Sequence, residues 1–202
     1  MKVLLINGSP RERGNTFTAL NEVATTLNAE GIQTEIISIG KKAVQGCIAC
    51  GMCGRTGKCT FNDDLYYQVL RTVSEGIDGL VVGSPVYYGG PNGSLCALLD
   101  RVFYSIGPQL QYKPGASVVV CRRGGASSAF DRLNKYFQMM NMPLVTSQYW
   151  NIVYGQTPGQ AAADEEGMQT MRTLARNMAW MVKSLGGRPQ TAEQRVWTNF
   201  IR

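Results

Sequence analysis

Short apolar runs alternate with segments of helical periodicity along most of this chain, and this alternation limits the folds open to it. The apolar runs are rich in β-branched residues, which is typical of buried strands. Strands are predicted at residues 3–6, 32–39, 79–83, 116–121 and within 144–153. Helices are predicted at residues 16–29, 63–74, 94–106, 128–140 and 164–185. Strands separated by such helices form parallel βαβ units, with helices on both faces of the sheet.

The pattern therefore predicts an α/β three-layer sandwich around a five-stranded parallel sheet with strand order 2-1-3-4-5. In this order the ligand crevice lies beyond the carboxyl ends of strands one, three and four. The 202 residues suffice for one domain, predicted at residues 1–187. A C-terminal tail, residues 188–202, carries Trp197, Phe200 and Ile201, and we expect it to pack at an oligomer interface.

The composition excludes several classes of chemistry. The chain has no histidine, so Ser-His and Cys-His nucleophile pairs and the usual neutral-pH proton shuttle are absent. The net charge of +6 comes from scattered basic residues, which favours phosphate-bearing cofactors over nucleic acid. No apolar run is long enough to span a bilayer and no signal peptide follows Met1, so no membrane partner is expected. We expect a cytoplasmic protein with reduced cysteines.

The loop after the first predicted strand, residues 8–16, has the composition of a phosphate site. The N-terminus of the following helix offers unpaired N–H groups and a partial positive charge. The loop adds side-chain donors and charge from Ser9, Arg11, Arg13, Asn15 and Thr16. It lacks both the Walker lysine and the glycines of the dinucleotide fingerprint, so a terminal monophosphate such as that of FMN fits best. An ordinary strand–turn–helix connection capped by Asn15 is the alternative.

Two later loops fall at the same predicted edge of the sheet. The loop at residues 84–93 can give a flat isoalloxazine ring a close backbone approach and an aromatic wall, through Tyr87, Tyr88, Gly89 and Gly90. The loop after the fourth strand can present a cation or amide donors to the reducing edge of a flavin, through Arg122, Gly124 and Gly125. A Gly/Pro-rich surface loop and solvated arginines are the alternatives.

Four cysteines lie close together in the segment after the second strand. Cys47, Cys50, Cys53 and Cys59 form the pattern C-x2-C-x2-C-x5-C. Zinc sites favour pairs of ligands separated by longer spans, and the pattern is closer to a [4Fe–4S] run, although no proline follows the last cysteine. Thiols that only pack, a zinc site and a disulfide formed in air are the alternatives. The other cysteines, Cys96 and Cys121, are expected in the core.

Three segments together resemble the NADPH-dependent FMN reductase group of flavodoxin-like proteins: Gly8–Thr16, Ser84–Gly93 and Leu98-Leu99-Asp100-Arg101. The likeness covers about residues 1–186, and the cysteine pattern is similar to the compact motif of iron–sulfur flavoproteins. It implies that the FMN phosphate is bound by Ser9, Arg11, Asn15 and Thr16, with Phe17 beside them. It also implies isoalloxazine contacts from Pro85, Val86, Tyr87, Tyr88 and Gly89.

The resemblance implies an FMN-dependent oxidoreductase. Electrons would pass from NAD(P)H through bound FMN to a quinone, a nitro or azo compound, free flavin or a protein acceptor. The alternative function is an iron–sulfur flavoprotein electron carrier with FMN and a [4Fe–4S] cluster, and a third is a flavin-responsive module without turnover. A homodimer or homotetramer is implied as well. No catalytic residue is identified, and Tyr87 and Tyr88 are the nearest candidates for proton transfer.

Overall fold

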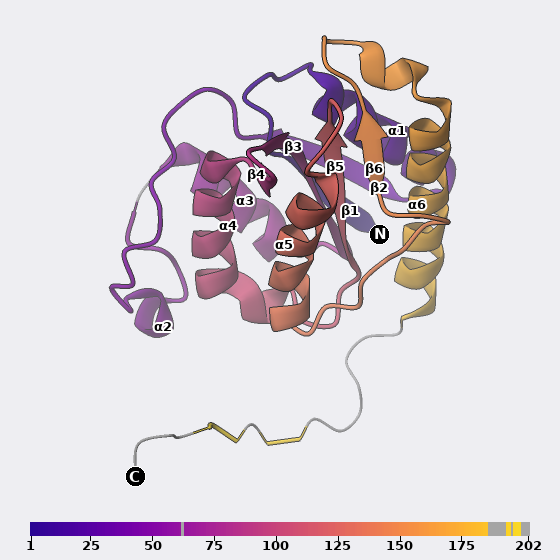
Figure 1. Cartoon of the computed structure of the whole chain (residues 1–202). Coiled ribbons are helices and arrows are strands. Elements are labelled where there is room, and N and C mark those ends of the chain that lie inside the picture. Colours follow the sequence, from indigo (N-terminus) through magenta and orange to yellow (C-terminus); the bar gives the residue numbers. More distant parts are fainter. Residues whose placement is uncertain (62, 186–192, 195, 199–202) are drawn as a thin grey trace.

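A five-stranded parallel sheet forms the centre of the molecule, in the order β2-β1-β3-β5-β6 (Figure 1). The computed structural model describes residues 1–61, 63–185, 193–194 and 196–198. The strands are β1 (Lys2–Asn7), β2 (Gln33–Ser38), β3 (Gly79–Tyr87), β5 (Gly115–Cys121) and β6 (Ile152–Tyr154). A short strand, β4 (Gly90–Pro91), pairs antiparallel with the end of β3. The predicted fold class and strand order are confirmed.

Helices cover both faces of the sheet (Figure 1). One face packs against α1 (Asn15–Ala29) and α6 (Glu165–Ser184). The other face packs against α3 (Asp64–Gly76), α4 (Gly93–Ile106) and α5 (Ala126–Met139). A single helical turn, α2 (Cys53–Thr56), and two 3-10 segments, Gly107–Gln109 and Gln160–Ala163, complete the described elements.

Side chains of each central strand alternate between the two hydrophobic layers. Leu4 and Ile6 of β1 belong to the layer under α3, α4 and α5, whereas Val3 and Leu5 belong to the layer under α1 and α6. All four side chains are fully buried. This arrangement explains the unbroken apolar runs in the sequence, because a strand covered on both faces has no solvent side.

Acidic or amide side chains cap three of the helices, but not α1. Asp63 accepts a hydrogen bond from the Tyr66 amide at 3.0 Å, and Asn92 accepts one from the Ser94 amide at 2.7 Å. The N-cap of α1 is Gly14, and no side chain in the described part of the chain caps that helix. The first-turn N–H groups of α1 are therefore available to a ligand.

The structure departs from the predicted boundaries at three places. β3 continues to Tyr87, four residues past the predicted end, because its last residues pair with β4. The fifth strand is only three residues long, while Leu144 forms an isolated bridge with Gly115. The α2 turn interrupts a segment for which no structure was predicted. Residues 188–202 lie mostly outside the described residues, so the predicted role of the tail stays a prediction.

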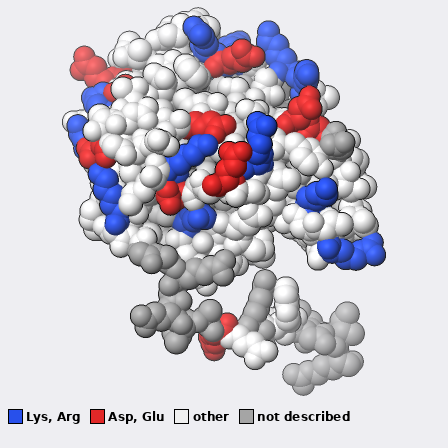
Figure 2. Space-filling view, turned by 180° about the vertical axis from the view of Figure 1, so that it is seen from behind, with Lys and Arg blue, Asp and Glu red and all other residues white. Residues whose placement is uncertain are grey.

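Charged side chains of both signs are mixed on the face of the molecule that Figure 2 shows. Figure 2 shows Lys and Arg interspersed with Asp and Glu on the face opposite to that of Figure 1. This agrees with the scattered basic residues of the sequence. Among the described helices, none is both long enough and apolar enough to cross a membrane.

Candidate functional site

A pocket opens where the parallel strands end, and loops after four of them line it. Its volume is about 620 Å³ including its open mouth. The lining residues are Ser9, Arg11, Gly14, Asn15, Thr16, Pro85, Val86, Tyr87, Val120, Cys121, Arg122, Gly155 and Gln156. The pocket lies at the point where a doubly wound sheet of this order binds ligands.

One end of this pocket has the donors that a phosphate requires. The hydroxyl groups of Ser9 and Thr16 belong to residues that are 5% and 2% exposed, and they lie beside the uncapped N-terminus of α1. The Arg11 amide donates to the Ser9 Oγ at 3.1 Å, which fixes the turn of the loop. Open amides, buried hydroxyls and the charge of Arg11 fit the terminal phosphate of FMN.

Asn15 has its polar atoms turned toward the polypeptide. Its Nδ2 donates to the carbonyl of Thr157 at 2.9 Å, and its Oδ1 accepts from the amide of Ala161 at 3.2 Å. Gly155 packs so closely here that a Cβ atom would lie 2.8 Å from the Asn15 Nδ2. Asn15 therefore ties the loop after β6 to the start of α1.

That tie places Gly155 and Gln156 in the wall of the pocket, a contribution that the sequence analysis missed. The available signal was the glycine directly after β6. The predicted crevice involved only the loops after strands one, three and four, whereas the structure adds the loop after the edge strand β6.

The loops after β3 and β5 are held together above the sheet. A Cβ atom on Gly125 would lie 2.9 Å from the Cα of Gly89, and Gly125 has a φ of +83°. The Ser128 hydroxyl donates to the Gly89 carbonyl. Gly89 and Gly125 thus permit a close approach of two backbones to each other, and this approach positions Pro85, Val86 and Tyr87 along the pocket.

The predicted flavin residues divide into two sets. Those that line the pocket are Ser9, Arg11, Asn15, Thr16, Pro85, Val86, Tyr87 and Arg122. Those outside the lining are Phe17, Tyr88, Gly89, Gly124 and Gly125. The Tyr88 side chain is fully exposed on a residue with φ of +51°, so it points to solvent.

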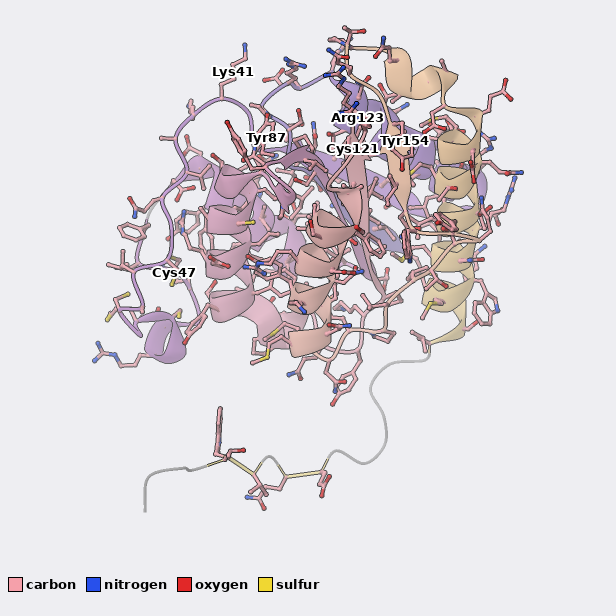
Figure 3. The ribbon with its side chains drawn as sticks, viewed as in Figure 1. Lys41, Cys47, Tyr87, Cys121, Arg123 and Tyr154 are labelled. Atoms are coloured by element: carbon pink, nitrogen blue, oxygen red, sulfur yellow. The ribbon has the colours of Figure 1, made fainter. Side chains whose placement is uncertain are left out.

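Cys121 is the one predicted core cysteine that also lines the pocket. It is buried at the end of β5, and burial raises the pKa of its thiol, so it is neutral at pH 7. Figure 3 shows Tyr87 and Cys121 at the strand ends and Cys47 on the flank of the molecule.

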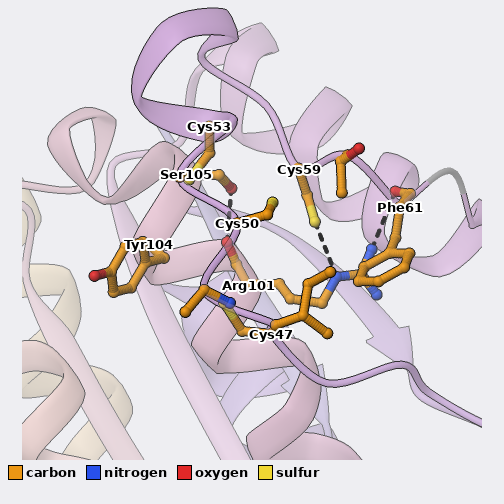
Figure 4. A pocket seen from close by; sticks show the side chains of 12 residues that line it. Cys47, Cys50, Cys53, Cys59, Phe61, Arg101, Tyr104 and Ser105 are labelled. Atoms are coloured by element: carbon orange, nitrogen blue, oxygen red, sulfur yellow. Dashed lines mark hydrogen bonds between the residues drawn. The ribbon is translucent and has the colours of Figure 1, made fainter.

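The four clustered cysteines line a second pocket, on the outer side of α4 (Figure 4). This pocket has a volume of about 360 Å³ and is also lined by Phe61, Arg101, Tyr104 and Ser105. All four thiols are free. Within residues 1–61 and 63–185, no three acidic, histidine or cysteine side chains converge closely enough to hold a single metal ion. Four free thiols around one pocket are the donor set of a [4Fe–4S] cluster, in which each sulfur binds a different iron.

Cys59 is the most firmly held of these cysteines. Its Sγ accepts a hydrogen bond from the Arg101 Nε at 3.3 Å, and its amide donates to the Tyr66 hydroxyl at 2.9 Å. Burial alone would lower the pKa of Arg101, but its hydrogen bonds to Cys59 and Asp63 raise the pKa overall. A permanent positive charge therefore lies beside one sulfur of the pocket.

Similar sequences are found among known proteins. The family model for NADPH-dependent FMN reductases matches residues 1–157. An iron-sulfur flavoprotein of Methanocaldococcus jannaschii is 38% identical over 191 residues, which cover 91% of this chain and 98% of that protein.

Two solved structures share the flavodoxin-like fold. RosB, with the bound intermediate 8-demethyl-8-formylriboflavin-5'-phosphate, has a TM-score of 0.71 at 16% identity and covers 92% of this chain and 80% of its own. A flavodoxin from the domain Archaea has a TM-score of 0.62 at 16% identity and covers 91% of this chain and 99% of its own.

Proposed function

We propose that this chain, which belongs to the NADPH-dependent FMN reductase family, is an oxidoreductase with FMN in the strand-end pocket and a [4Fe–4S] cluster at Cys47, Cys50, Cys53 and Cys59. In this function, that of an iron–sulfur flavoprotein, the two cofactors exchange electrons with an external donor or acceptor. When bound, the flavin supplies exchange of one or two electrons and the cluster supplies exchange of one.

The observation that carries this proposal is the gathering of four free thiols around one pocket beside a buried cation. An iron–sulfur cluster with four thiolates is anionic, and a neighbouring guanidinium offsets that charge. Thiols that served only to pack the loop would be buried, but Cys47 and Cys50 are exposed. The name of the Methanocaldococcus jannaschii relative supports the same conclusion.

The residues of the strand-end pocket have separate tasks in flavin binding. Ser9, Thr16 and the first-turn amides of α1 would hold the phosphate, and Arg11 would add charge. Pro85, Val86 and Tyr87 would bound the ring. Arg122 lines the pocket and would supply a cation that stabilises negative charge at the pyrimidine edge. None of these tasks requires a histidine.

Purification and reconstitution without oxygen test the proposal. We expect FMN together with about four iron and four sulfide per chain. Cys59→Ser should lose most of the iron and keep FMN, because no residue in the described part of the chain lines both pockets. Cys96→Ser, which removes a cysteine of α4 outside the cysteine pocket, is the matched control and should keep both. A wild-type protein that binds FMN but no iron contradicts the proposal.

The second candidate is a reductase that takes hydride directly from NAD(P)H, and the family match over residues 1–157 favours it. Adding NADH or NADPH without oxygen distinguishes the two functions. Rapid bleaching of the bound flavin by a nicotinamide supports the reductase. Bleaching by dithionite but by neither nicotinamide supports the electron carrier.

A further inference from the structure

Arg101 is a fully buried charge in the apolar face of α4. It is 1% exposed, and its neighbours on that helix face are core residues such as Leu98 and Val102. Burying a charged group is costly unless charge and hydrogen-bond partners compensate it. The groups that contact the Arg101 guanidinium therefore indicate the role of this buried charge.

The guanidinium reaches both ends of the cysteine segment and one sulfur within it. Figure 4 shows its contacts with Cys59 and Phe61. Nη1 donates to the carbonyl of Gln45 at 3.3 Å, and Nη2 donates to the carbonyl of Phe61 at 3.2 Å. Nε donates to the Cys59 Sγ at 3.3 Å. Gln45 precedes the first cysteine and Phe61 follows the last, so one side chain holds the segment at both ends.

Asp63 is the acidic partner of Arg101. Its Oδ2 is buried and lies 2.5 Å from the Arg101 Nη2, and its Oδ1 caps α3. Two carbonyls and a sulfur take the remaining donors. A neutral thiol is a weak acceptor, whereas a hydrogen bond to an anionic sulfur is charge-assisted and stronger. The geometry thus fits an anionic centre on the sulfur side of the guanidinium.

Two rings fix the orientation of the guanidinium. Its central carbon lies 4.8 Å from the ring centroid of Tyr66 and 5.6 Å from that of Phe61. Tyr66 also accepts the Cys59 amide, so the ring and the sulfur ligand move together. Arg101 is therefore rigid relative to Cys59.

Resting on the proposed function, we propose that Arg101 is a positioning residue that fixes Cys59 and raises the reduction potential of the cluster. Reduction adds one electron, and hence one negative charge, to a centre that is already anionic. A buried cation with an N–H···S bond stabilises the reduced state more than the oxidised state. Arg101 lies on α4, whose N-cap Asn92 belongs to the loop after β3 that is proposed to contact the flavin.

Two substitutions separate charge from geometry. Arg101→Lys keeps the charge but cannot reach all the acceptors, whereas Arg101→Gln keeps a donor and loses the charge. Arg132→Gln is the control, because Arg132 lies on α5, is half exposed and is outside the cysteine pocket. Circular dichroism and FMN binding show whether each variant folds. The readouts are iron per chain and the midpoint potential of the cluster, titrated without oxygen.

We expect the midpoint potential to fall from wild type to Lys to Gln. The loss of charge should shift the one-electron equilibrium at least tenfold, or about 59 mV. A loaded Arg101 variant with the wild-type potential overturns the proposal. If neither variant loads iron, the wild-type protein labelled with 15N-arginine decides. Its reduced cluster should then show a hyperfine coupling to 15N that survives Arg55→Lys, and the absence of that coupling overturns the proposal.

The same measurements separate this inference from the proposed function. Wild-type protein without iron refutes both. If the wild-type protein holds a cluster and its midpoint potential is the same in the Arg101 variants, only the inference is refuted.

Discussion

At the start of α1, Asn15 shares its amide between two residues of the loop after β6. Its Nδ2 donates to the Thr157 carbonyl and its Oδ1 accepts from the Ala161 amide, so Asn15 links segments more than 140 residues apart in the sequence. The sequence analysis assigned Asn15 to the phosphate as a side-chain donor and through the family resemblance, and Asn15 lines the pocket. In the structure both of its polar atoms hydrogen-bond to backbone, and we propose that it also acts on the ligand through Gly155 and Gln156.

Replacing Asn15 with Ala should therefore weaken FMN binding through the loop. We expect roughly a tenfold increase in the Kd of FMN and a loss of about 1–2 kcal/mol in unfolding free energy. Flavin fluorescence titration and urea unfolding measure the two effects. Asn177→Ala is the control, because it removes a 2.7 Å bond to the Thr146 carbonyl away from the pocket. An equal loss of FMN affinity in both variants would contradict this role.

Gly125 allows the contact between the loops above the pocket. Gly125→Ala should cost about 1–3 kcal/mol of stability, because it combines a positive φ with a Cβ too close to Gly89. FMN affinity should fall as well, since the contact positions the flavin loop. Gly124→Ala is matched by position, and its Cβ would meet no atom within 4 Å. Thermal unfolding and FMN titration should show an effect for Gly125→Ala and almost none for Gly124→Ala.

Tyr136 gives the stability a dependence on alkaline pH. Burial, and then its hydrogen bond to Asp100, raise the pKa of this phenol well above its ordinary value. In the unfolded chain the phenol ionises near about pH 10. Above that pH the unfolded state loses a proton that the folded state keeps, so stability falls by up to about 1.4 kcal/mol per pH unit. Below that pH the contribution is fully present.

Tyr136→Phe should remove this contribution. Urea unfolding between pH 8 and pH 11 is expected to show a steeper fall in the wild type than in the variant. Other groups titrate in the same range in both proteins, so the difference between the two curves isolates Tyr136. Parallel curves would show that the phenol is not protected.

At the scale of elements, the segment between β2 and α3 depends on its cysteine pocket. Its only described helix is the four-residue α2, and Lys41, Lys42, Arg55 and Lys58 are exposed along it. Most of the contacts that hold it converge on Arg101 and Cys59. A segment with so little internal structure should open locally before the core does.

Limited digestion with trypsin tests this expectation. Protein that has lost its iron should be cut first at residues 41–58, while the reconstituted protein resists and the sheet stays intact in both. Mass spectrometry of the fragments identifies the sites. First cleavage at Arg122 or Arg123 in both forms would show that the pocket does not control the segment.

The sequence predicted the buried elements well and the connections poorly. The predicted bounds of β1 and α1 agree with the structure to within one residue. A strand buried on both faces gives a continuous apolar run, and a helix buried along one side gives apolar residues at helical spacing. β4 has two residues, one of them a proline, and carries no period at all. Gly155 and Arg101 were missed as site residues for a related reason. Each acts through a contact with a segment distant in sequence, which local spacing does not reveal.

For the whole molecule, exposed aromatic residues gather beside the edge strand β6. Tyr149, Trp150 and Tyr154 are each about half exposed or more and line one hollow there. Exposed apolar surface at a sheet edge is typical of a contact between subunits. The family resemblance implied a homodimer or homotetramer, and this surface is the described place where one can form.

Truncation tests the share of the tail in such assembly. A chain that ends at Gly187 should form an assembly of fewer subunits than the full chain, as measured by light scattering, because residues 188–202 are predicted to pack on the partner subunit. Trp150→Ser, within the full chain, should lower the mass of the assembly if the β6 edge is the interface. An unchanged mass in the truncated chain assigns no assembly role to the tail.

Among the described residues, the strand-end pocket and the cysteine pocket have no lining residue in common. The proposed function then allows each to be filled or emptied without the other. Protein handled in air and stripped of iron would, on this proposal, remain yellow and able to exchange electrons with dyes. Activity measured in air would then report on the flavin alone. The yellow colour of the protein would not reveal that the cluster had been lost.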